Sequence, residues 1–238
     1  MHDSLCRRLD WDSEFFGFEI ALLSVSRLDD RCVKEAFTWC TQHGTRCLYF
    51  LADAADMTTL SIAGTNAFRL VDIRITLDRP IEDQRVPTPS VREARDDDVG
   101  ELRNIARESH RGTRFYNDPG FPSARCDEFY STWIERSCRG YADLVFVAEQ
   151  DGAIQGYITC HRREPQVGVI GLVAVRESFR RLGFGRQLIE ASFRYFLENS
   201  IRTIEVVTQG NNIASQRLYQ ACGFRTKSVE LWFHRWFS

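Results

Sequence analysis

The chain has 238 residues and a formal net charge of −2, which is enough for one large or two small domains. Its 43% hydrophobic and 27% charged residues are ordinary for a soluble globular protein. The balanced charge predicts no nucleic-acid partner. The longest apolar runs are too short to span a bilayer, and the N-terminus has no secretory signal, so we expect a cytoplasmic protein with no membrane partner.

The cysteines argue against a disulfide framework. There are eight of them at irregular spacing, several lie in apolar stretches, and none forms a C-x-x-C pair. We therefore expect reduced, mostly buried thiols and no metal site.

The N-terminal region reads as an α/β unit. Trp11, Phe15, Phe16 and Phe18 crowd its start and belong either to a core or to a surface that binds a ring-shaped ligand. Apolar periodicity then predicts three strands and two helices over residues 1–79. The strands are IALLSV, RCLYFLA and the stretch with alternating Leu70, Ile73, Ile75 and Leu77, and the helices are 29–43 and one beginning at Met57.

Residues 80–90 read as a linker, because they hold three of the six prolines in a polar stretch. We expect a small N-terminal domain over 1–88 and a second domain over 89–238.

The second region begins with a strand at 91–94 and a helix capped by 96–98. A loop at 110–122 and an amphipathic helix, ARCDEFYSTWIERSC, follow. Three antiparallel strands then lead to a glycine-bearing turn. The remaining predicted elements are a helix at about 183–199, a strand at 203–208, a helix capped by Asn and a C-terminal strand over SVELWFHRWF.

Residues 169–198 carry the main chemical signal. An apolar strand leads through a basic turn with Gly183 and Gly185 directly into an amphipathic helix. Such a turn gathers backbone N–H groups and a helix N-terminus into one concavity that suits a phosphate or pyrophosphate. The dinucleotide fingerprint G-x-G-x-x-G fails because Leu188 stands where its third glycine belongs, and no P-loop lysine follows.

Arg180, Gly183 and Gly185 in this setting resemble the signature of the GCN5-related N-acetyltransferases. The resemblance implies a mixed, largely antiparallel α/β sheet flanked by helices, and acetyl-CoA as cosubstrate. In that family the turn holds the coenzyme A pyrophosphate and the preceding strand pairs with the pantetheine arm. The residues implied to bind the cofactor are Val173, Ala174, Val175, Arg180, Arg181, Leu182, Gly183, Phe184, Gly185, Asn212 and Tyr219.

A second element supports the same resemblance. Asn212, Ala214, Tyr219, Gly223 and Phe224 are similar to the last helix motif of the family. The resemblance implies that Asn212 contacts acetyl-CoA and that the Tyr219 hydroxyl protonates the departing thiolate. The alternative for Tyr219 is a partly buried core tyrosine.

The implied reaction is direct attack of an amine on the thioester carbonyl, which requires positioning, a base and an oxyanion donor. By resemblance the oxyanion donor is a strand amide near 173–175. The identity of the general base stays open among Glu205, His161 and a water chain. Both side chains also suit surface or structural roles.

For the acceptor, LDWDSEFFGFEIALL and the segment around 113–140 resemble the TDP-fucosamine acetyltransferase branch of the family. This implies acetylation of the amine of a nucleotide-linked 4-amino-4,6-dideoxyhexose for a surface polysaccharide. Arg114 is predicted to pair with the diphosphate, and Phe115 or Tyr116 to stack on a ring. Alternatively, Phe115 and Phe121 pin the loop to the body. The chain departs from the family at Arg181, where glycine is common, and at Glu177, where proline is common.

Two further interpretations stay open. The same chemistry can act on a protein N-terminus, an antibiotic or another small amine, or the chain can be a catalytically silent CoA-binding module. The aromatic C-terminal strand is compatible with a homodimer or with burial inside one subunit.

Overall fold

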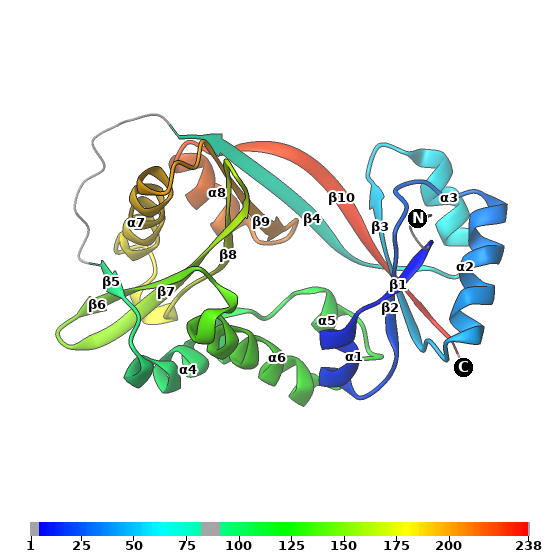
Figure 1. The fold of residues 1–238 in the computed structure, drawn as a ribbon, viewed down its shortest axis with the longest axis horizontal. Helices are drawn as coiled ribbons and strands as arrows, with labels where there is room; N and C mark the ends of the chain where they lie inside the picture. Colours follow the sequence, from blue (N-terminus) through cyan, green and yellow to red (C-terminus); the bar gives the residue numbers. More distant parts are fainter. Residues whose placement is uncertain (1–4, 82–90, 238) are drawn as a thin grey trace.

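The computed structural model describes residues 5–81 and 91–237, which form one ten-stranded sheet in the order β1-β2-β3-β10-β4-β9-β8-β7-β6-β5. Only the β2–β3 and β8–β9 pairs are parallel. The predicted fold class, a mixed and largely antiparallel sheet flanked by helices, is confirmed (Figure 1). The strands are β1 (Cys6–Arg8), β2 (Ile20–Leu23), β3 (Cys47–Asp53), β4 (Arg69–Pro80), β5 (Val91–Glu93), β6 (Leu144–Gln150), β7 (Ala153–Glu164), β8 (Val167–Val175), β9 (Thr203–Gln209) and β10 (Arg225–Trp236).

The helices follow the predicted caps closely. Asp29 caps the second helix by accepting a hydrogen bond from the Cys32 N–H at 2.7 Å, and Asn212 caps the last helix in the same way through the Ser215 N–H at 3.2 Å. The helices are α1 (Asp10–Phe16), α2 (Asp30–Gln42), α3 (Met57–Thr65), α4 (Val99–Ser109), α5 (Arg114–Asn117), α6 (Ser123–Arg136), α7 (Phe184–Glu198) and α8 (Ile213–Ala221).

Strands β4 and β10 join the two ends of the sheet. β4, from the N-terminal region, lies between β9 and β10, and the C-terminal half of β10 pairs with β3. The sheet therefore runs without interruption through strands from both predicted domains. Of the predicted linker over 80–90, Pro80 is the last residue of β4. Residues 82–90, with the boundary at 88/89, lie outside the described residues, so the division into two domains stays a prediction.

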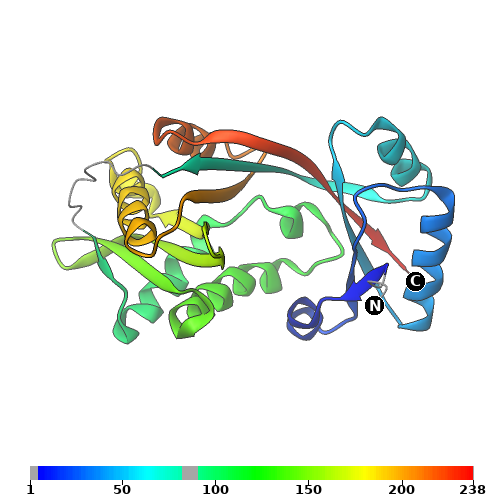
Figure 2. The same ribbon diagram turned by 45° about the horizontal axis from the view of Figure 1, so that its top comes forward.

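Two lobes result from this arrangement. Figures 1 and 2 both show the long strands β4 and β10 connecting the lobes along one side, while the segment from α6 through α5 reaches α1 along the other. Packing follows the same division. One face of the sheet near β7 and β8 is covered by α4 and α6, and the opposite face is covered by α7 and α8.

Helix α1 was missed by the sequence pattern, which gave three strands and two helices for residues that form four strands and three helices. Its seven residues, DWDSEFF, mix three aromatic with four polar side chains, and the segment is too short for a clear helical period. Phe16 is 8% exposed, and its ring stacks on Phe129 of α6 at 5.5 Å. Trp11 packs on the same Phe129 ring at 4.4 Å. These contacts favour the core interpretation of the aromatic cluster.

Strand β4 departs from its predicted alternation. Register shifts interrupt its pairing with β10, one of them beside Leu70. As a result Val71 and Leu77 are buried, whereas Leu70 and Ile73 are 49% and 40% exposed. A bulge changes which face the following side chains occupy, and a sequence pattern of period two does not reveal it.

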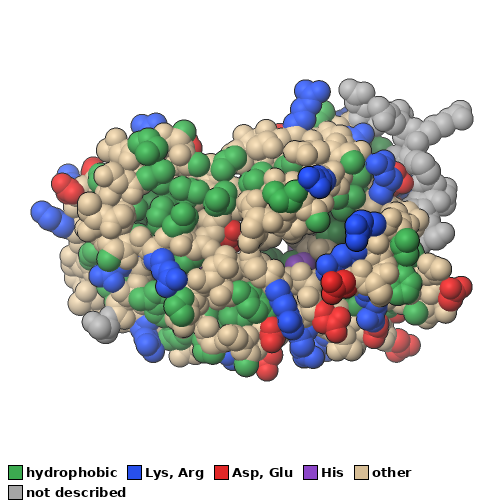
Figure 3. Space-filling model, turned by 180° about the vertical axis from the view of Figure 1, so that it is seen from behind, with side chains coloured by type: hydrophobic (Ala, Val, Ile, Leu, Met, Phe, Trp, Pro, Cys, Tyr) green, Lys and Arg blue, Asp and Glu red, His purple; other side chains and the backbone are tan. Residues whose placement is uncertain are grey.

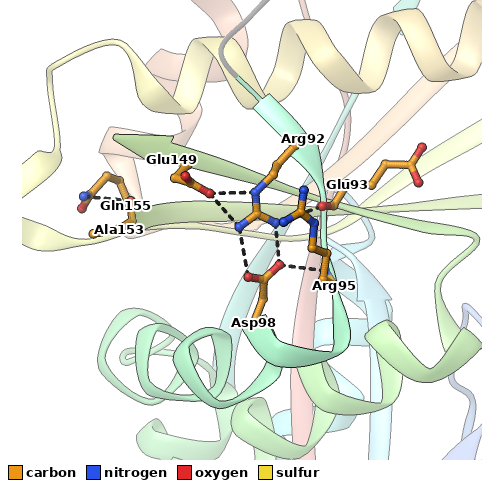
Figure 4. Close-up of polar contacts among 7 residues, drawn as sticks. All are labelled: Arg92, Glu93, Arg95, Asp98, Glu149, Ala153 and Gln155. Carbon is orange, nitrogen blue, oxygen red and sulfur yellow. Dashed lines mark hydrogen bonds and ion pairs between the residues drawn. The ribbon is translucent and has the colours of Figure 1, made fainter. Parts of the chain in front are cut away.

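An arginine-centred network fixes the start of α4 (Figure 4). Arg92 of β5 donates to Glu149 of β6 at 2.7 Å and to Asp98 at 2.6 Å. Asp98 also accepts from the Arg95 N–H at 2.7 Å. The predicted acidic cap thus acts through a 3-10 turn at Asp96–Asp98 that precedes α4.

All eight cysteines are free thiols, and six of them are buried. Within 5–81 and 91–237, no helix combines the length and apolar character needed to cross a membrane.

Candidate functional site

A fork opens in the sheet between β8 and β9. The two strands pair in parallel only from Val167 with Thr203 to Ile170 with Val206, although β8 continues to Val175 and β9 to Gln209. On its other side β8 remains paired with β7 as far as Val175. Among the described residues, the edge of β8 beyond Ile170 that faces β9 therefore has no strand partner. Its amide and carbonyl groups are available to an extended ligand.

A bulge in β8 marks the vertex of the fork. The register with β7 shifts between Ile158 and Cys160, so Gly171 and Leu172 both lie opposite Thr159. The Leu172 N–H donates to the Thr159 hydroxyl at 2.8 Å instead of to a strand carbonyl. Bulges bend and twist the strand that carries them, which accounts for the divergence of β8 from β9 at this point.

The fork leads into a cavity of about 690 Å³. Figure 3 shows the face opposite that of Figure 1 hollowed near its middle, with basic side chains gathered along one side of the hollow. The cavity walls come from the C-terminal end of α4, the end of β8, the turn before α7, the end of β9 and the first turns of α8. The lining residues are Ser109, His110, Arg111, Gly112, Val173, Ala174, Val175, Arg180, Arg181, Gly183, Gly185, Arg186, Gln209, Asn211, Asn212, Ala214, Ser215, Arg217 and Leu218.

The turn between β8 and α7 has the predicted geometry for an anion. Arg181 and Gly183 both adopt the left-handed region, with φ of 65° and 95°. No side chain caps α7, so its first amides and the positive end of its dipole are free for a ligand. At Gly185, a Cβ would lie 2.9 Å from Leu218 of α8, so glycine there lets α8 approach closely.

The charge of the cavity is strongly positive although the whole chain is nearly neutral. Five arginines line it and no carboxylate does so among its described lining residues. Arg180 and Arg181 were predicted here. Arg111, Arg186 and Arg217 were not assigned to this cavity, because they come from α4's end, α7 and α8 and only the fold brings them together.

Most of the predicted cofactor residues meet in this cavity. Its lining includes Val173–Val175, Arg180, Arg181, Gly183, Gly185 and Asn212. The Leu182 side chain is 62% exposed and that of Phe184 is 7% exposed in the core. Neither of these two side chains lines the cavity.

Tyr219 lies just behind the cavity wall. It is 4% exposed and packs in the same cluster as Ile170 and Val206, the last paired residues of the fork. Burial raises the pKa of its hydroxyl, against the lowering effect of a hydrogen bond with Ser215. The hydroxyl is therefore protonated at neutral pH. Ser215, which also occupies the third position after the capping Asn212, lines the cavity.

His110 is a cavity residue that the sequence reasoning missed. It follows α4, its Nε2 lies 2.9 Å from the Tyr157 hydroxyl, and its ring stacks on Tyr130 at 4.8 Å. Burial lowers the pKa of His110 to about 4, so the ring is neutral at pH 7. Its position directly after an amphipathic helix, before a glycine loop, is the only sequence signal that pointed to it.

The predicted acceptor residues lie outside this cavity. Arg114 is surrounded by rings, with its guanidinium carbon 4.3 Å from the Trp232 centroid and 4.8 Å from that of Tyr49. Phe115 is 3% exposed in the core. Tyr116 donates its hydroxyl hydrogen bond to Asp127 at 2.6 Å. The predicted loop 110–122 contains the single turn α5, and its binding role stays a prediction.

A buried carboxylate pins this loop to the C-terminal strand. Asp118 accepts hydrogen bonds from His234 Nδ1 at 2.6 Å, from Trp236 Nε1 at 2.9 Å and from the Gly120 N–H at 2.9 Å. Phe121 is 3% exposed in the same core as Phe115. The packing therefore agrees with the alternative in which Phe115 and Phe121 attach the loop 110–122 to the core of the protein.

The two side chains suggested as bases lie on the face of the sheet away from α7. Glu205 forms an ion pair with Lys227 and lies 4.0 Å from Arg163. His161 of β7 is opposite Val169 of β8, which is opposite Glu205 of β9. Within the described residues, no group of three or more His, Cys, Asp or Glu is placed to hold a metal ion.

Comparison with known proteins gives the context for this geometry. The dTDP-fucosamine acetyltransferase of Escherichia coli is 24% identical over 95% of this chain and 96% of its own length. The spore coat polysaccharide biosynthesis protein SpsD of Bacillus subtilis is 24% identical over 58% of this chain and 48% of its own. A solved GCN5-related N-acetyltransferase from Sphaerobacter thermophilus superposes with a TM-score of 0.67 at 17% identity, covering 97% of this chain and 76% of that one.

The family model of the GNAT acetyltransferases matches residues 100–224. This segment spans α4 to α8 and so contains the fork, the glycine turn and the arginine-lined cavity. Its match confirms the family predicted from Arg180, Gly183 and Gly185. The chain belongs to the GNAT family of acetyltransferases.

Proposed function

We propose that the protein transfers an acetyl group from acetyl-CoA to the amine of a nucleotide-linked amino-dideoxy sugar of the 4-amino-4,6-dideoxyhexose type. The observation that carries the donor half is the cavity at the fork, with five arginines and an uncapped helix N-terminus. The observation that carries the acceptor half is the similarity to the dTDP-fucosamine acetyltransferase over nearly the whole of both chains.

The residues present fit coenzyme A. The unpaired edge of β8 at Val173–Val175 suits the amides of the pantetheine arm, and the turn at Gly183 and Gly185 suits the pyrophosphate. Arg180, Arg181 and the other lining arginines neutralise the phosphates. Asn212 holds the start of α8 against the same cavity. Leu182 and Phe184 contribute backbone rather than side chains to this proposed site.

The chain's residues supply positioning and proton transfer. A free β8 amide beyond the bulge donates to the carbonyl oxygen as charge develops on it. Tyr219, neutral in its buried position, protonates the leaving thiolate, with Ser215 between its hydroxyl and the cavity. The amine and the thioester are held together in one ternary complex, which replaces a bimolecular encounter with an oriented one.

The acceptor is expected beside the loop 110–122. Arg114 is the proposed partner of the diphosphate, and the aromatic side chains Tyr116 and Trp232 nearby offer ring surfaces. Phe115 supports this region from the core. The free thiols are consistent with action in the reducing cytoplasm. The proposed acceptor site is formed by one chain and requires no second copy.

A thiol-release assay tests the proposal. The protein is incubated with acetyl-CoA and a panel of amino-sugar nucleotides, aminoglycosides, polyamines and peptide N-termini, and released CoA is measured. We expect release with a dTDP-linked 4-amino-4,6-dideoxyhexose and acetylated sugar in equal amount. Release only with another amine would contradict the acceptor half. Acetyl-CoA binding without release on any amine would favour the silent CoA-binding module.

A further inference from the structure

Glycine at position 171 exposes a histidine at the vertex of the fork. A Cβ on Gly171 would lie 2.6 Å from His161 Nε2 and 2.7 Å from the Thr159 hydroxyl. These separations are shorter than any van der Waals contact allows, so a side chain at this position would displace the imidazole. Gly171 directly follows Ile170, the last β8 residue paired with β9. The imidazole edge therefore reaches the point where the unpaired edge of β8 begins.

The His161 ring is held in place from two directions. Nε2 lies 3.3 Å from the Thr159 hydroxyl, which itself accepts from the Leu172 N–H at 2.8 Å. The ring of Tyr141 packs edge-on against the imidazole at 5.6 Å. Because Leu172 belongs to the bulge, the same contacts that shape the fork also orient the histidine.

Tyr219 and His161 approach the vertex from opposite faces of the sheet. Tyr219 packs with Ile170, Ile158 and Val206 on the face covered by α7 and α8. His161 lies in the row of Val169 and Glu205, and its Nε2 lies beside Gly171 on the other face. Neither side chain lines the cavity, but the two lie on opposite faces of the sheet near the vertex, where the proposed thioester would lie between those faces.

We propose that His161 is the general base of the acetyl transfer, taking the proton of the attacking amine at Nε2. This assignment rests on the proposed function, because it needs acetyl-CoA in the fork. The amine nitrogen forms its bond to the carbonyl carbon and gives one proton to His161. The carbon–sulfur bond then breaks, and the thiolate takes a proton from Tyr219. Solvent restores both side chains, so the net change is one proton moved from nitrogen to sulfur.

The other candidates fit this role less well. Glu205 forms ion pairs with Lys227 and Arg163. These two cations stabilise its carboxylate and already contact both of its oxygens. His110 lines the cavity, but its Nε2 is used by the Tyr157 hydroxyl and its ring is sandwiched against Tyr130. His161 is half-buried and does not line the cavity, but its Nε2 lies beside Gly171, where the unpaired edge of β8 begins.

Burial, rather than the surrounding charges, favours a neutral His161 ring. Burial lowers its pKa, while Asp143 and the backbone of Tyr141 raise it and Arg163 lowers it again. Asp143 is shared with Arg162, which lies 2.8 Å from it. Across Val169, the facing charges are Glu205 on β9 and Lys227 on β10, which form a pair. A ring that is neutral near pH 7 accepts a proton and loses this ability as the pH falls.

The test compares His161→Gln with the wild-type protein. We expect kcat to fall about a hundredfold, which is within the usual range for loss of a general base, with acetyl-CoA affinity unchanged by calorimetry. As the pH falls below neutral, log kcat/KM should decrease in both proteins. The slope for the wild-type protein should be steeper than that for the variant by one unit of log kcat/KM per pH unit. His43→Gln, an exposed histidine after α2, is the matched control.

Gly171→Ala provides a second variant that leaves the imidazole in the chain but moves it. It should lower kcat and flatten the pH profile as His161→Gln does, whereas Gly64→Ala, where a Cβ meets no atom within 4 Å, should not. Wild-type kcat and an unchanged slope in His161→Gln would overturn the assignment while leaving acetyl transfer intact. If the wild-type protein turns over no amine at all, the proposed function fails and the assignment falls with it.

Discussion

The proposed donor and acceptor sides of this protein are built on different principles. The donor side is an open cavity made of free backbone groups and five arginines, and most of it comes from one stretch between β8 and α8. The region around the loop 110–122 is a closed network in which Asp118, His234, Trp236 and aromatic side chains satisfy one another. Backbone and charge suffice for a phosphate-rich cofactor, whereas the acceptor region is tied to the core and to β10.

Removal of the proposed proton donor, the Tyr219 hydroxyl, should have the largest effect. Tyr219→Phe removes only the hydroxyl, so kcat should fall roughly tenfold to a thousandfold while acetyl-CoA affinity stays nearly constant. Steady-state kinetics and calorimetry measure the two quantities separately. Tyr195→Phe on α7, away from the cavity lining, is the control. An unchanged kcat would remove Tyr219 from the mechanism and leave it as a core residue.

Acid should destabilise the fold in part through His234, which lies in the proposed acceptor region. Burial lowers the pKa of His234 from its ordinary value of 6.5 to about 4, although the hydrogen bond with Asp118 raises it. Between these values the unfolded chain binds more protons than the folded one. Stability therefore falls as the pH drops from about 6.5 to 4, by about 3 kcal/mol for this residue.

Urea unfolding at several pH values measures this loss, and His234→Gln should reduce its slope. An equal slope in the variant and the wild-type protein would show that His234 does not titrate in this range. His110, whose pKa burial also lowers to about 4, should account for part of the slope that remains.

A charge placed in the glycine turn should affect only the donor side. Gly183 has a φ of 95°, and aspartate there adds both backbone strain and a negative charge where the phosphates are expected. We expect acetyl-CoA affinity to fall by roughly tenfold or more, equivalent to about 1.4 kcal/mol. Gly183→Ala separates strain from charge. Equal affinity of Gly183→Asp by calorimetry would refute the pyrophosphate assignment.

Replacing a single arginine of the cavity should have the smallest effect on acetyl-CoA affinity. Arg217→Gln should weaken acetyl-CoA binding about threefold to fivefold at low salt, and the difference should shrink as salt is added, because exposed ion pairs are worth about 0.2–1 kcal/mol. Arg225→Gln, an exposed position at the start of β10, is the control. A salt-independent loss would point to a structural role for Arg217 instead.

The features that the sequence predicted are those that depend on neighbouring residues, and the features that it missed depend on tertiary packing. The turn with Gly183 and Gly185 and the cap at Asn212 are local, so spacing along the chain was enough to identify them. His110, Arg186 and Arg217 reach the cavity from separate elements, and their place depends on tertiary packing. The surroundings of Arg114 come from α1, β3 and β10, which are far apart in the sequence. The bulges in β4 and β8 left no pattern at all.

The central claim is that acetyl-CoA lies in the fork, between the free edge of β8 and the N-terminus of α7. A crystal structure of the protein with CoA tests it most directly. We expect the pyrophosphate on the amides at 183–186, the pantetheine arm along Val173–Val175 and the sulfur between the sheet faces that carry Tyr219 and His161. Density for CoA elsewhere on the molecule, with the fork closed or empty, would contradict the account.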